Sequence, residues 1–307
     1  MNWTLSPATV FAASPVVPVM VIDDLAHAVP MAKALAAGGI TVFEITLRTP
    51  VALNAIRAIR EAMPDALVGA GTILNPQQYD DAVAAGAQFI ISPGFTDKLL
   101  AHAAANAVPL IPGVSTPSEV MTALDLGYTH LKFFPAEANG GAPALQAISA
   151  PLAQVKFCPT GGIGPKNVAA YLALKCVATV GGSWMIPADK VKAGDWAGIT
   201  ALSAEAVALI NGLKGQLVGK IRGCQIAENK TQTRCKSIHG RSTAASLPPT
   251  VCLFTSGYLL YYRVVTSNNT SVFYYLQLAL KNQNLKYSAP PTTQNLNQSP
   301  VPLMPRH

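Results

Sequence analysis

The sequence predicts an α/β protein whose parallel strands close into a (β/α)8 barrel, and three observations support this prediction. Between Val16 and Ser183, short runs of β-branched and other apolar residues alternate with Ala- and Leu-rich segments of helical spacing. The runs are apolar on both faces, as parallel strands covered by helices are. No G-x-G-x-x-G motif follows the first run, which argues against an open, doubly wound sheet that binds nucleotides.

Eight such runs follow one another along the chain. They are Val16–Ile22, Ile40–Leu47, Ala66–Ile73, Phe89–Ser92, Val108–Val114, His130–Ala136, Gln154–Thr160 and Val177–Ser183. The segments between them start near Asp, Thr, Asn or Pro, and several end at Gly, as helices do. We expect an N-terminal helix before the first run and a closing eighth helix at Asp195–Gly215, which together complete a TIM barrel.

Charge divides the 307-residue chain into two parts. Residues 1–215 hold 12 Lys and Arg against 14 Asp and Glu, whereas residues 216–307 hold 10 basic residues and one acid, Glu228. The predicted barrel domain is therefore 1–215, and 216–307 is a basic, acid-poor C-terminal extension. Its basic residues are dispersed rather than clustered, so we expect no nucleic-acid partner and no membrane partner.

The cysteines and the N-terminal residues indicate a cytoplasmic protein. Cys158 and Cys176 are expected to be buried free thiols, which suit a reducing compartment. The opening stretch "MNWTLSPATVFAASPVVPV" lacks the basic n-region of a signal peptide. We therefore expect the barrel to fold in the cytoplasm.

A barrel of this kind places its chemistry at the C-terminal ends of its strands. In "FEITLRT" the alternation of a strand sends Phe43 and Ile45 towards the helices, so Glu44 and Arg48 point into the barrel mouth. A purely structural role stays open for both charged residues, because barrels also bury ion pairs that close one end of the barrel and take no part in chemistry.

A lysine, Lys132, lies inside the apolar run "HLKFFPA" and shares its inward face with Phe134. One interpretation is that its head reaches water at the strand end. The other is that burial disfavours the ammonium form, and the neutral amine is a nucleophile towards carbonyl carbons. Convergence with Glu44 and Arg48 in one mouth favours chemistry.

Two threonines extend this group. Thr160 ends the inward set of its strand, and Thr72 shares the parity of Val68 and Ala70 and is placed in the same mouth. Two glycine-rich stretches, "TGGIGPKN" and "GGSW", follow the seventh and eighth runs, where barrels commonly bind phosphate through backbone N–H groups. Tight turns also use glycine for steric reasons alone, but the position of both stretches favours phosphate.

Together these motifs resemble a known family. In this order and spacing, "FEITLRT", "GAGTILNPQQ", "ISPG", "PLIPGVSTPSE", "KFFPAEANGG", "FCPTGGI" and "GGSWMIP" resemble bacterial 2-keto-3-deoxy-6-phosphogluconate (KDPG) aldolase. This is the class I, Schiff-base aldolase of the Entner–Doudoroff pathway. The resemblance covers Met1 to about Gly215, and it implies a (β/α)8 barrel that assembles as a homotrimer.

The resemblance also implies a role for each residue. Lys132 matches the Schiff-base lysine and Glu44 the general acid/base. The remaining matches are the groups that hold the pyruvate carboxylate (Arg48 and Thr72), those that line the site (Pro93, Phe134 and Thr160) and the phosphate site (Gly161, Gly162 and Ser183). No cofactor is implied and no metal, and the scattered histidines form no convincing ligand set.

The implied reaction is the cleavage of KDPG, a phosphosugar acid, to pyruvate and glyceraldehyde 3-phosphate. Cleavage of 4-hydroxy-2-oxoglutarate (KHG) to pyruvate and glyoxylate uses the same lysine and carboxylate grip, and it is the alternative as main or second activity. A catalytically silent phosphosugar-binding barrel is the alternative from a different class. The joint presence of Glu44, Arg48 and Lys132 argues against it, because a binder has no use for a buried neutral lysine.

The extension, residues 216–307, admits three interpretations. It is an appendage for nucleic acid or membrane surfaces, a secreted module with "NKT" and "NNT" as glycosylation sites, or a read-through or frame-shifted segment without a selected fold. The last is favoured because acids, periodicity and capping signals are all lacking. We expect the extension to be disordered, with "VFYYLQLAL" as an aggregation-prone stretch.

Overall fold

The computed structural model describes residues 1–216 with their side chains, and the backbone of 250–255, 258–263 and 277–280. By its internal contacts the chain divides into two units, Met1–Gly223 and Cys224–His307. The boundary after residue 215 that charge suggests stays a prediction.

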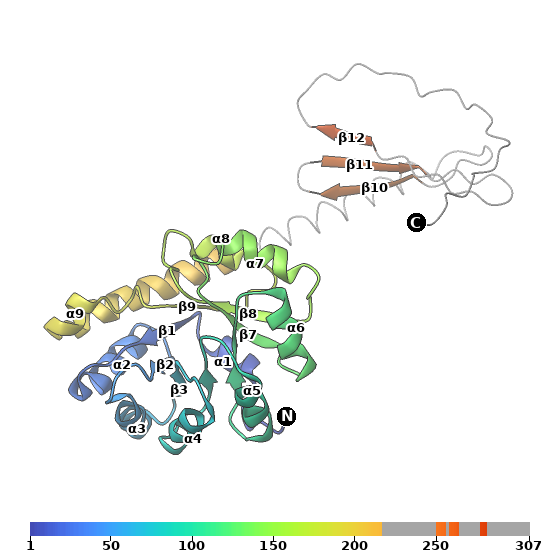
Figure 1. Cartoon of the computed structure of the whole chain (residues 1–307). Coiled ribbons are helices and arrows are strands. Elements are labelled where there is room, and N and C mark those ends of the chain that lie inside the picture. The colour runs from blue at the N-terminus through green and yellow to red at the C-terminus, as the bar shows by residue number, and fades with distance from the viewer. Residues whose placement is uncertain (217–249, 256–257, 264–276, 281–307) are drawn as a thin grey trace, which may run out of the picture. The chain divides into compact units, whose positions relative to one another are not determined.

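The strands of the first unit are all parallel and lie in the apolar runs. They are β1 (Val16–Met20), β2 (Val42–Thr46), β3 (Leu67–Gly71), β4 (Ile90–Ile91), β5 (Leu110–Ile111), β6 (Gly113–Val114), β7 (His130–Phe133), β8 (Lys156–Pro159) and β9 (Val180–Gly182). They form two sheets, ordered β5-β4-β3-β2-β1-β9 and β6-β7-β8. Only Pro112, which has no N–H to donate, separates β5 from β6. The fold is thus α/β with a curled parallel sheet (Figure 1).

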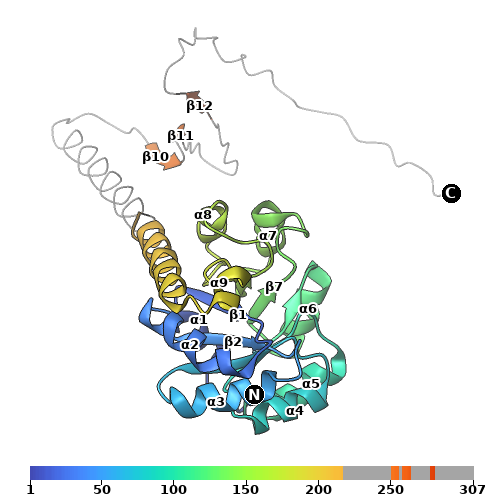
Figure 2. The same ribbon diagram turned by 90° about the vertical axis from the view of Figure 1, so that its left-hand side faces the viewer.

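Helices surround this sheet, most of them on its outer side and α1 where the strands begin (Figures 1 and 2). They are α1 (Pro7–Ala13), η1 (Leu25–His27), α2 (Ala28–Ala37), α3 (Ala52–Ala62), α4 (Pro76–Ala84), α5 (Asp97–Ala105), α6 (Pro117–Asp125), α7 (Gly141–Ser149), α8 (Val168–Leu172), α9 (Ala188–Ala193) and a last helix, Trp196–Gln216. Asn75, Thr96 and Thr116 cap α4, α5 and α6 by accepting a hydrogen bond from the first turn. These caps fix the loops that follow the strands.

Apolar side chains fill two layers, because neighbouring residues of a strand face opposite sides. Phe43 of β2 belongs to the layer between sheet and helices, whereas Val42 belongs to an inner layer with Phe89. Val10 and Phe11 of α1 join that inner layer. The expected N-terminal helix is therefore present, and it packs where the strands begin.

The last helix, Trp196–Gln216, is long and apolar enough by length and composition to cross a membrane, with a mean hydropathy of 1.3. Its residues Ile199, Ser203, Ala206 and Ile210 are nevertheless buried, and their spacing puts them on one face of the helix. Thr200 Oγ1 donates to the carbonyl of Ala34 in α2 at 3.1 Å. The helix therefore serves as the expected eighth helix of the fold.

In the second unit the structure describes three antiparallel strands, β10 (Thr250–Thr255), β11 (Tyr258–Arg263) and β12 (Gln277–Leu280), in the order β10-β11-β12. Where it is described, the extension thus forms strands, which its β-branched and aromatic residues favour. The expectation of disorder otherwise falls on residues 217–249, 256–257, 264–276 and 281–307, which lie outside the described residues.

Candidate active site

Lys132 and Glu44 meet inside the curled sheet, on β7 and β2. The Nζ atom of Lys132 donates a hydrogen bond to Oε1 of Glu44 at 3.0 Å. The two residues are 5% and 1% exposed, so water does little to solvate either charge. Replacing such a buried pair by apolar residues is often neutral or stabilising, so stability gives a weak reason for it. A carboxylate 3.0 Å from an amine can accept its proton, and an amine without that proton is a nucleophile.

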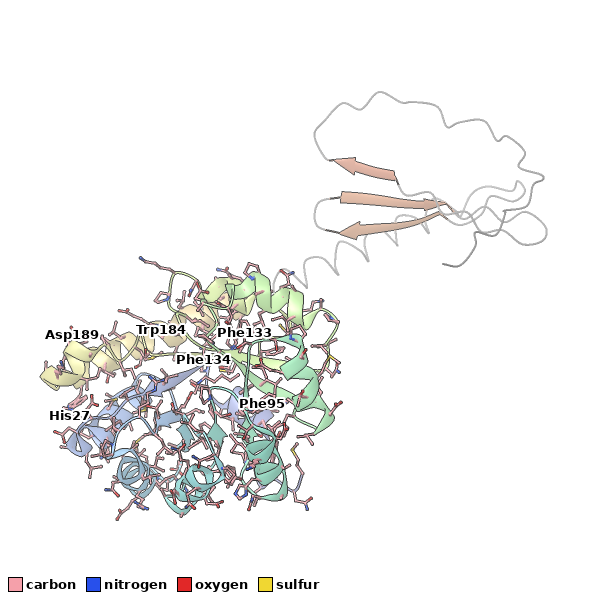
Figure 3. The ribbon with its side chains drawn as sticks, viewed as in Figure 1. His27, Phe95, Phe133, Phe134, Trp184 and Asp189 are labelled. Carbon is pink, nitrogen blue, oxygen red and sulfur yellow. The ribbon has the colours of Figure 1, made fainter. Side chains whose placement is uncertain are left out.

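The side chains around the Lys132–Glu44 pair are apolar or weakly polar. Phe134, consecutive with Phe133 (Figure 3), lies with its ring centre 5.2 Å from Nζ of Lys132. Cys158, buried beside the pair, has its Sγ atom 3.8 Å from Oγ1 of Thr160. Burial raises the pKa of the Cys158 thiol to about 12, although the nearby Lys132 ammonium opposes this. The thiol therefore stays neutral and leaves the charge of the pair undisturbed.

Two glycines that the sequence analysis missed make room for these side chains. A Cβ added at Gly71 of β3 would lie 2.7 Å from Cγ of Glu44 and closer still to its Oε1 atom. A Cβ added at Gly181 of β9 would likewise lie 3.0 Å from Cγ2 of Thr160. The sequence did hold a signal for both, because a glycine at an inward position of a strand often marks a close approach of another group.

Arg48 and Thr72 come together at the rim of the sheet. The Arg48 Nε atom donates to Oγ1 of Thr72 at 3.4 Å, and the guanidinium is exposed. The parity argument for Thr72 was wrong, because Val68 and Ala70 lie in the outer layer against the helices. Thr72 reaches the rim because its backbone is left-handed, with φ at 61°, which turns the chain away from the strand alternation.

The loop after β8 holds Gly161 and Gly162 in left-handed conformations, with φ at 106° and 78°. Asn167 pins this loop, since its Nδ2 donates to the Gly162 carbonyl and its Oδ1 accepts from the Gly164 N–H, both at 2.9 Å. Within residues 1–216, the N–H groups of Gly162 and Ser183 have no acceptor. Unpaired N–H groups on a fixed loop can receive an anion.

Pro93 follows β4 and is half-buried at the same end of the sheet. Its carbonyl backs onto Gly113 of β6, where any added Cβ would collide with it. All ten predicted residues therefore follow strands at one end of the sheet or lie on its inner face there. Glu44 with Lys132 and Arg48 with Thr72 are joined by direct hydrogen bonds.

A family model described as KDPG and KHG aldolase matches residues 8–202 of this chain. The chain belongs to the KDPG and KHG aldolase family.

Members of this family are similar to the chain over its first two thirds. The KHG/KDPG aldolase of Escherichia coli (strain K12) is 58% identical over 206 residues, 67% of this chain and 97% of that protein. The 2-dehydro-3-deoxy-phosphogluconate aldolase of Dickeya dadantii (strain 3937) is 59% identical over 207 residues, with the same coverage. A crystal structure of KDPG aldolase from Legionella pneumophila, with pyruvate captured as a covalent carbinolamine, is 54% identical with a TM-score of 0.66. It covers 67% of this chain and all of that one.

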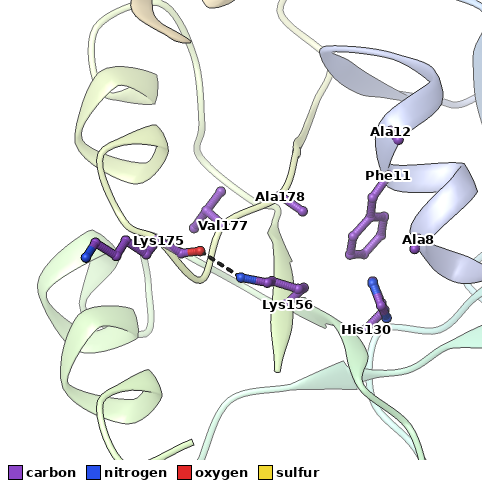
Figure 4. A pocket seen from close by; sticks show the side chains of 8 residues that line it. All are labelled: Ala8, Phe11, Ala12, His130, Lys156, Lys175, Val177 and Ala178. Atoms are coloured by element: carbon purple, nitrogen blue, oxygen red, sulfur yellow. Dashed lines mark hydrogen bonds between the residues drawn. The ribbon is translucent and has the colours of Figure 1, made fainter. Parts of the chain in front are cut away.

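At the other end of this aldolase-family fold, a cavity of about 230 Å³ opens where β7 and β8 begin (Figure 4). It is lined by Ala8, Phe11, Ala12, His130, Lys156, Lys175, Val177 and Ala178. The Lys156 Nζ atom donates to the Lys175 carbonyl at 3.1 Å. None of the predicted site residues lines this cavity.

Among the described residues, no group of three or more His, Cys, Asp and Glu side chains is placed to hold a metal ion. That the reaction of this family member needs no metal and no cofactor stays a prediction.

Proposed function

We propose that this chain is a class I aldehyde-lyase that cleaves KDPG to pyruvate and glyceraldehyde 3-phosphate through a Schiff base on Lys132. The buried hydrogen bond between Lys132 and Glu44, 3.0 Å long, is the observation that carries the proposal. Membership in the family and the names of the E. coli and Dickeya relatives support the substrate.

The reaction begins with the pair itself. Glu44 takes a proton from the Lys132 ammonium, and the neutral amine attacks the C2 ketone of the substrate. The protonated Glu44 then returns its proton to the carbinolamine hydroxyl, which leaves as water. The product is a positively charged imine on Lys132, and Glu44 is again a carboxylate.

Cleavage uses the imine as an electron sink. The Glu44 carboxylate takes the C4 hydroxyl proton, directly or through a water, and the C3–C4 bond breaks. Its electron pair forms the enamine of pyruvate on Lys132, while glyceraldehyde 3-phosphate leaves. Glu44 then protonates C3, and water hydrolyses the restored imine to release pyruvate and the Lys132 ammonium.

The remaining residues hold the two charged ends of the substrate. The Arg48 guanidinium can fork onto the carboxylate beside C2, with Thr72 as a second donor. We assign the phosphate to the loops that carry Gly161, Gly162 and Ser183, where N–H groups are unpaired within the described residues. The positions that line the substrate between these ends are Pro93, Phe134 and Thr160.

The strand pairing supports a closed barrel rather than an open curled sheet. One run supplies β5 to the first sheet and β6 to the second, on either side of Pro112. At the other side, parallel bridges join Phe157 with Val177 and Thr160 with Gly181. We therefore propose a (β/α)8 barrel that carries the site at the C-terminal ends of its strands.

We further propose that the enzyme is a cytoplasmic homotrimer. Several large apolar side chains stay exposed on the first unit, namely Val21, Leu25, Leu74, Met121 and Leu126, and burial between copies would remove them from water. Light scattering on the purified chain measures this, and a monomer at working concentration would contradict it.

KHG cleavage is the second candidate activity, favoured by the double name of the E. coli relative. Values of kcat/KM for KDPG and KHG, measured on the same preparation, rank the two substrates. A KHG value above the KDPG value would make KHG cleavage the main activity.

The deciding experiment is borohydride reduction in the presence of pyruvate, read by intact mass and peptide mapping. We expect one reduced pyruvyl adduct on Lys132 in the full-length chain and none in Lys132→Met. An adduct on another lysine, or its absence in folded protein, would contradict the Schiff-base mechanism.

A further inference from the structure

Two residues that the reaction does not use, Glu137 and Tyr171, lie against the loop of Gly161 and Gly162. Tyr171 of α8 is 1% exposed, and its hydroxyl donates a hydrogen bond to Oε1 of Glu137. The backbone N–H of Glu137 donates in turn to the carbonyl of Gly161 at 3.1 Å. A buried phenol on α8 is thus linked to the glycine loop through one residue, Glu137, whose carboxylate accepts from Tyr171 and whose backbone N–H donates to Gly161.

The side chain of Glu137 also fills the space that Gly162 leaves empty. A Cβ added at Gly162 would lie 2.7 Å from Cγ and 2.8 Å from Cβ of Glu137. Glu137 therefore supports the loop twice, by its main chain at Gly161 and by its side chain at Gly162. The bond from Tyr171 fixes the far end of this support.

The hydroxyl of Tyr171 also restricts where the negative charge of Glu137 can lie. It holds the Oε1 atom at α8, so the carboxylate cannot turn freely about its side chain. Burial, and then the carboxylate of Glu137, raise the pKa of Tyr171, so its hydroxyl keeps its proton and donates throughout the neutral range. Tyr171 is thus a permanent donor to Glu137.

We infer that Tyr171 and Glu137 are positioning residues that hold the Gly161–Gly162 loop in the form that receives the substrate phosphate, and that they thereby set the preference for KDPG over KHG. The inference rests on the proposed phosphate site. KHG has no phosphate, so a change in the position of the loop affects the cleavage of KDPG alone. A change in the chemistry at Lys132 affects the cleavage of both substrates.

The test compares KDPG and KHG cleavage by the full-length chain and by Tyr171→Phe, which keeps the ring and removes the donor. We expect the KM for KDPG to rise by about fivefold to tenfold, the effect of losing one hydrogen bond of ordinary strength. The kcat for KDPG and the kcat/KM for KHG stay within about twofold. The inhibition constant of inorganic phosphate against KDPG rises in parallel with the KM for KDPG.

Conservative replacement supplies a second measurement. Glu137→Gln keeps an oxygen that accepts the bond from Tyr171, so we expect it to retain the wild-type ratio of the two substrates. Glu137→Ala removes the side-chain part of the support and the acceptor of the Tyr171 bond, and we expect it to reproduce the loss of Tyr171→Phe. Tyr128→Phe is the matched control, because this equally buried hydroxyl donates to the Leu100 carbonyl at 2.6 Å, away from the loop. Its substrate ratio stays that of the wild type.

Two outcomes overturn the inference in distinguishable ways. If inorganic phosphate does not compete with KDPG in the wild type, the phosphate site itself is wrong, and the inference falls with it. If phosphate competes equally in the wild type and in Tyr171→Phe, or if the variant loses both substrates equally, the phosphate site stands and the positioning role alone is wrong.

Discussion

At the residue scale, Glu44 reaches Lys132 because β3 presents glycine where a side chain would collide. An added Cβ at Gly71 would lie 2.7 Å from Cγ of Glu44. We predict that Gly71→Ala displaces the carboxylate and lowers kcat for KDPG by about 100-fold, the cost of misplacing a catalytic group by roughly 1 Å. Steady-state kinetics on folded enzyme measure this.

Gly69→Ala is the control for that prediction. A Cβ at Gly69, also on β3, would meet the ring of Phe89 rather than Glu44. We expect it to lower the melting temperature through overpacking, while kcat per folded enzyme changes far less. Equal kcat values for the two variants would show that Gly71 acts through stability and not through Glu44.

Cys158 gives a second prediction at this scale. Burial raises the pKa of its thiol from 9.0 to about 12. The folded state therefore favours the neutral thiol, and the resulting stability is complete below pH 9 and is lost as pH rises towards 12. At about pH 8 we expect iodoacetamide to spare Cys158 in the native chain and to modify it after unfolding. Rapid native modification of Cys158, found by peptide mapping, would contradict its burial.

At the scale of the element, alternation along a strand was sufficient wherever the residue lies inside one. The opposite faces of Phe43 and Glu44 on β2 and the inward side of Lys132 on β7 were predictable for this reason. The same rule does not apply to Thr72, because this residue follows the end of β3 and has a left-handed backbone. No residue near it signals that conformation.

The sequence pattern could not predict contacts between distant elements. The bond between Glu137 and Tyr171 joins residues 34 positions apart, and the space at Gly71 has meaning only beside Glu44. The break between β5 and β6 at Pro112 lies within one continuous apolar run. Each of these depends on which elements become neighbours, and periodicity carries no such information.

The contact of α1 with β7 makes the fold sensitive to acid. The ring of His130 lies edge-on to Phe11, with centroids 5.4 Å apart. Burial, and then the nearby Lys156, lower the pKa of His130 below its ordinary value of 6.5. The neutral ring is favoured in the folded state, so its contribution to stability is present above pH 6.5 and is lost as pH falls through the folded pKa.

We therefore predict that the urea midpoint falls between about pH 7.5 and about pH 5.5, and that His130→Phe reduces this fall. Phe11→Ala should lower the free energy of unfolding by about 3–5 kcal/mol at both pH values, because it leaves a cavity in the inner layer. An identical pH dependence in His130→Phe and the wild type would exclude His130 as the group responsible.

At the scale of the whole molecule, the proposed site residues and residues 224–307 of the extension belong to different units. Every proposed site residue lies in Met1–Gly223, and the family model ends at residue 202. We predict that a fragment ending at Gly223 keeps kcat/KM for KDPG within about twofold of the full-length value, since no described contact of the site lies beyond this unit. Steady-state kinetics on both proteins measure this.

A shorter fragment that ends at Gly194 is the control, because it removes the helix Trp196–Gln216 with the buried Ile199 and Ile210. We expect it to be insoluble or unfolded, since it exposes the apolar surface that this helix covers.

Light scattering on the Gly223 fragment then separates two roles of the extension. If the fragment is trimeric and active while the full-length chain is neither, residues 224–307 obstruct assembly. If both proteins are equally active trimers, residues 224–307 are neutral for assembly and catalysis. Activity restricted to the full-length chain would contradict the assignment of catalysis to the first unit alone.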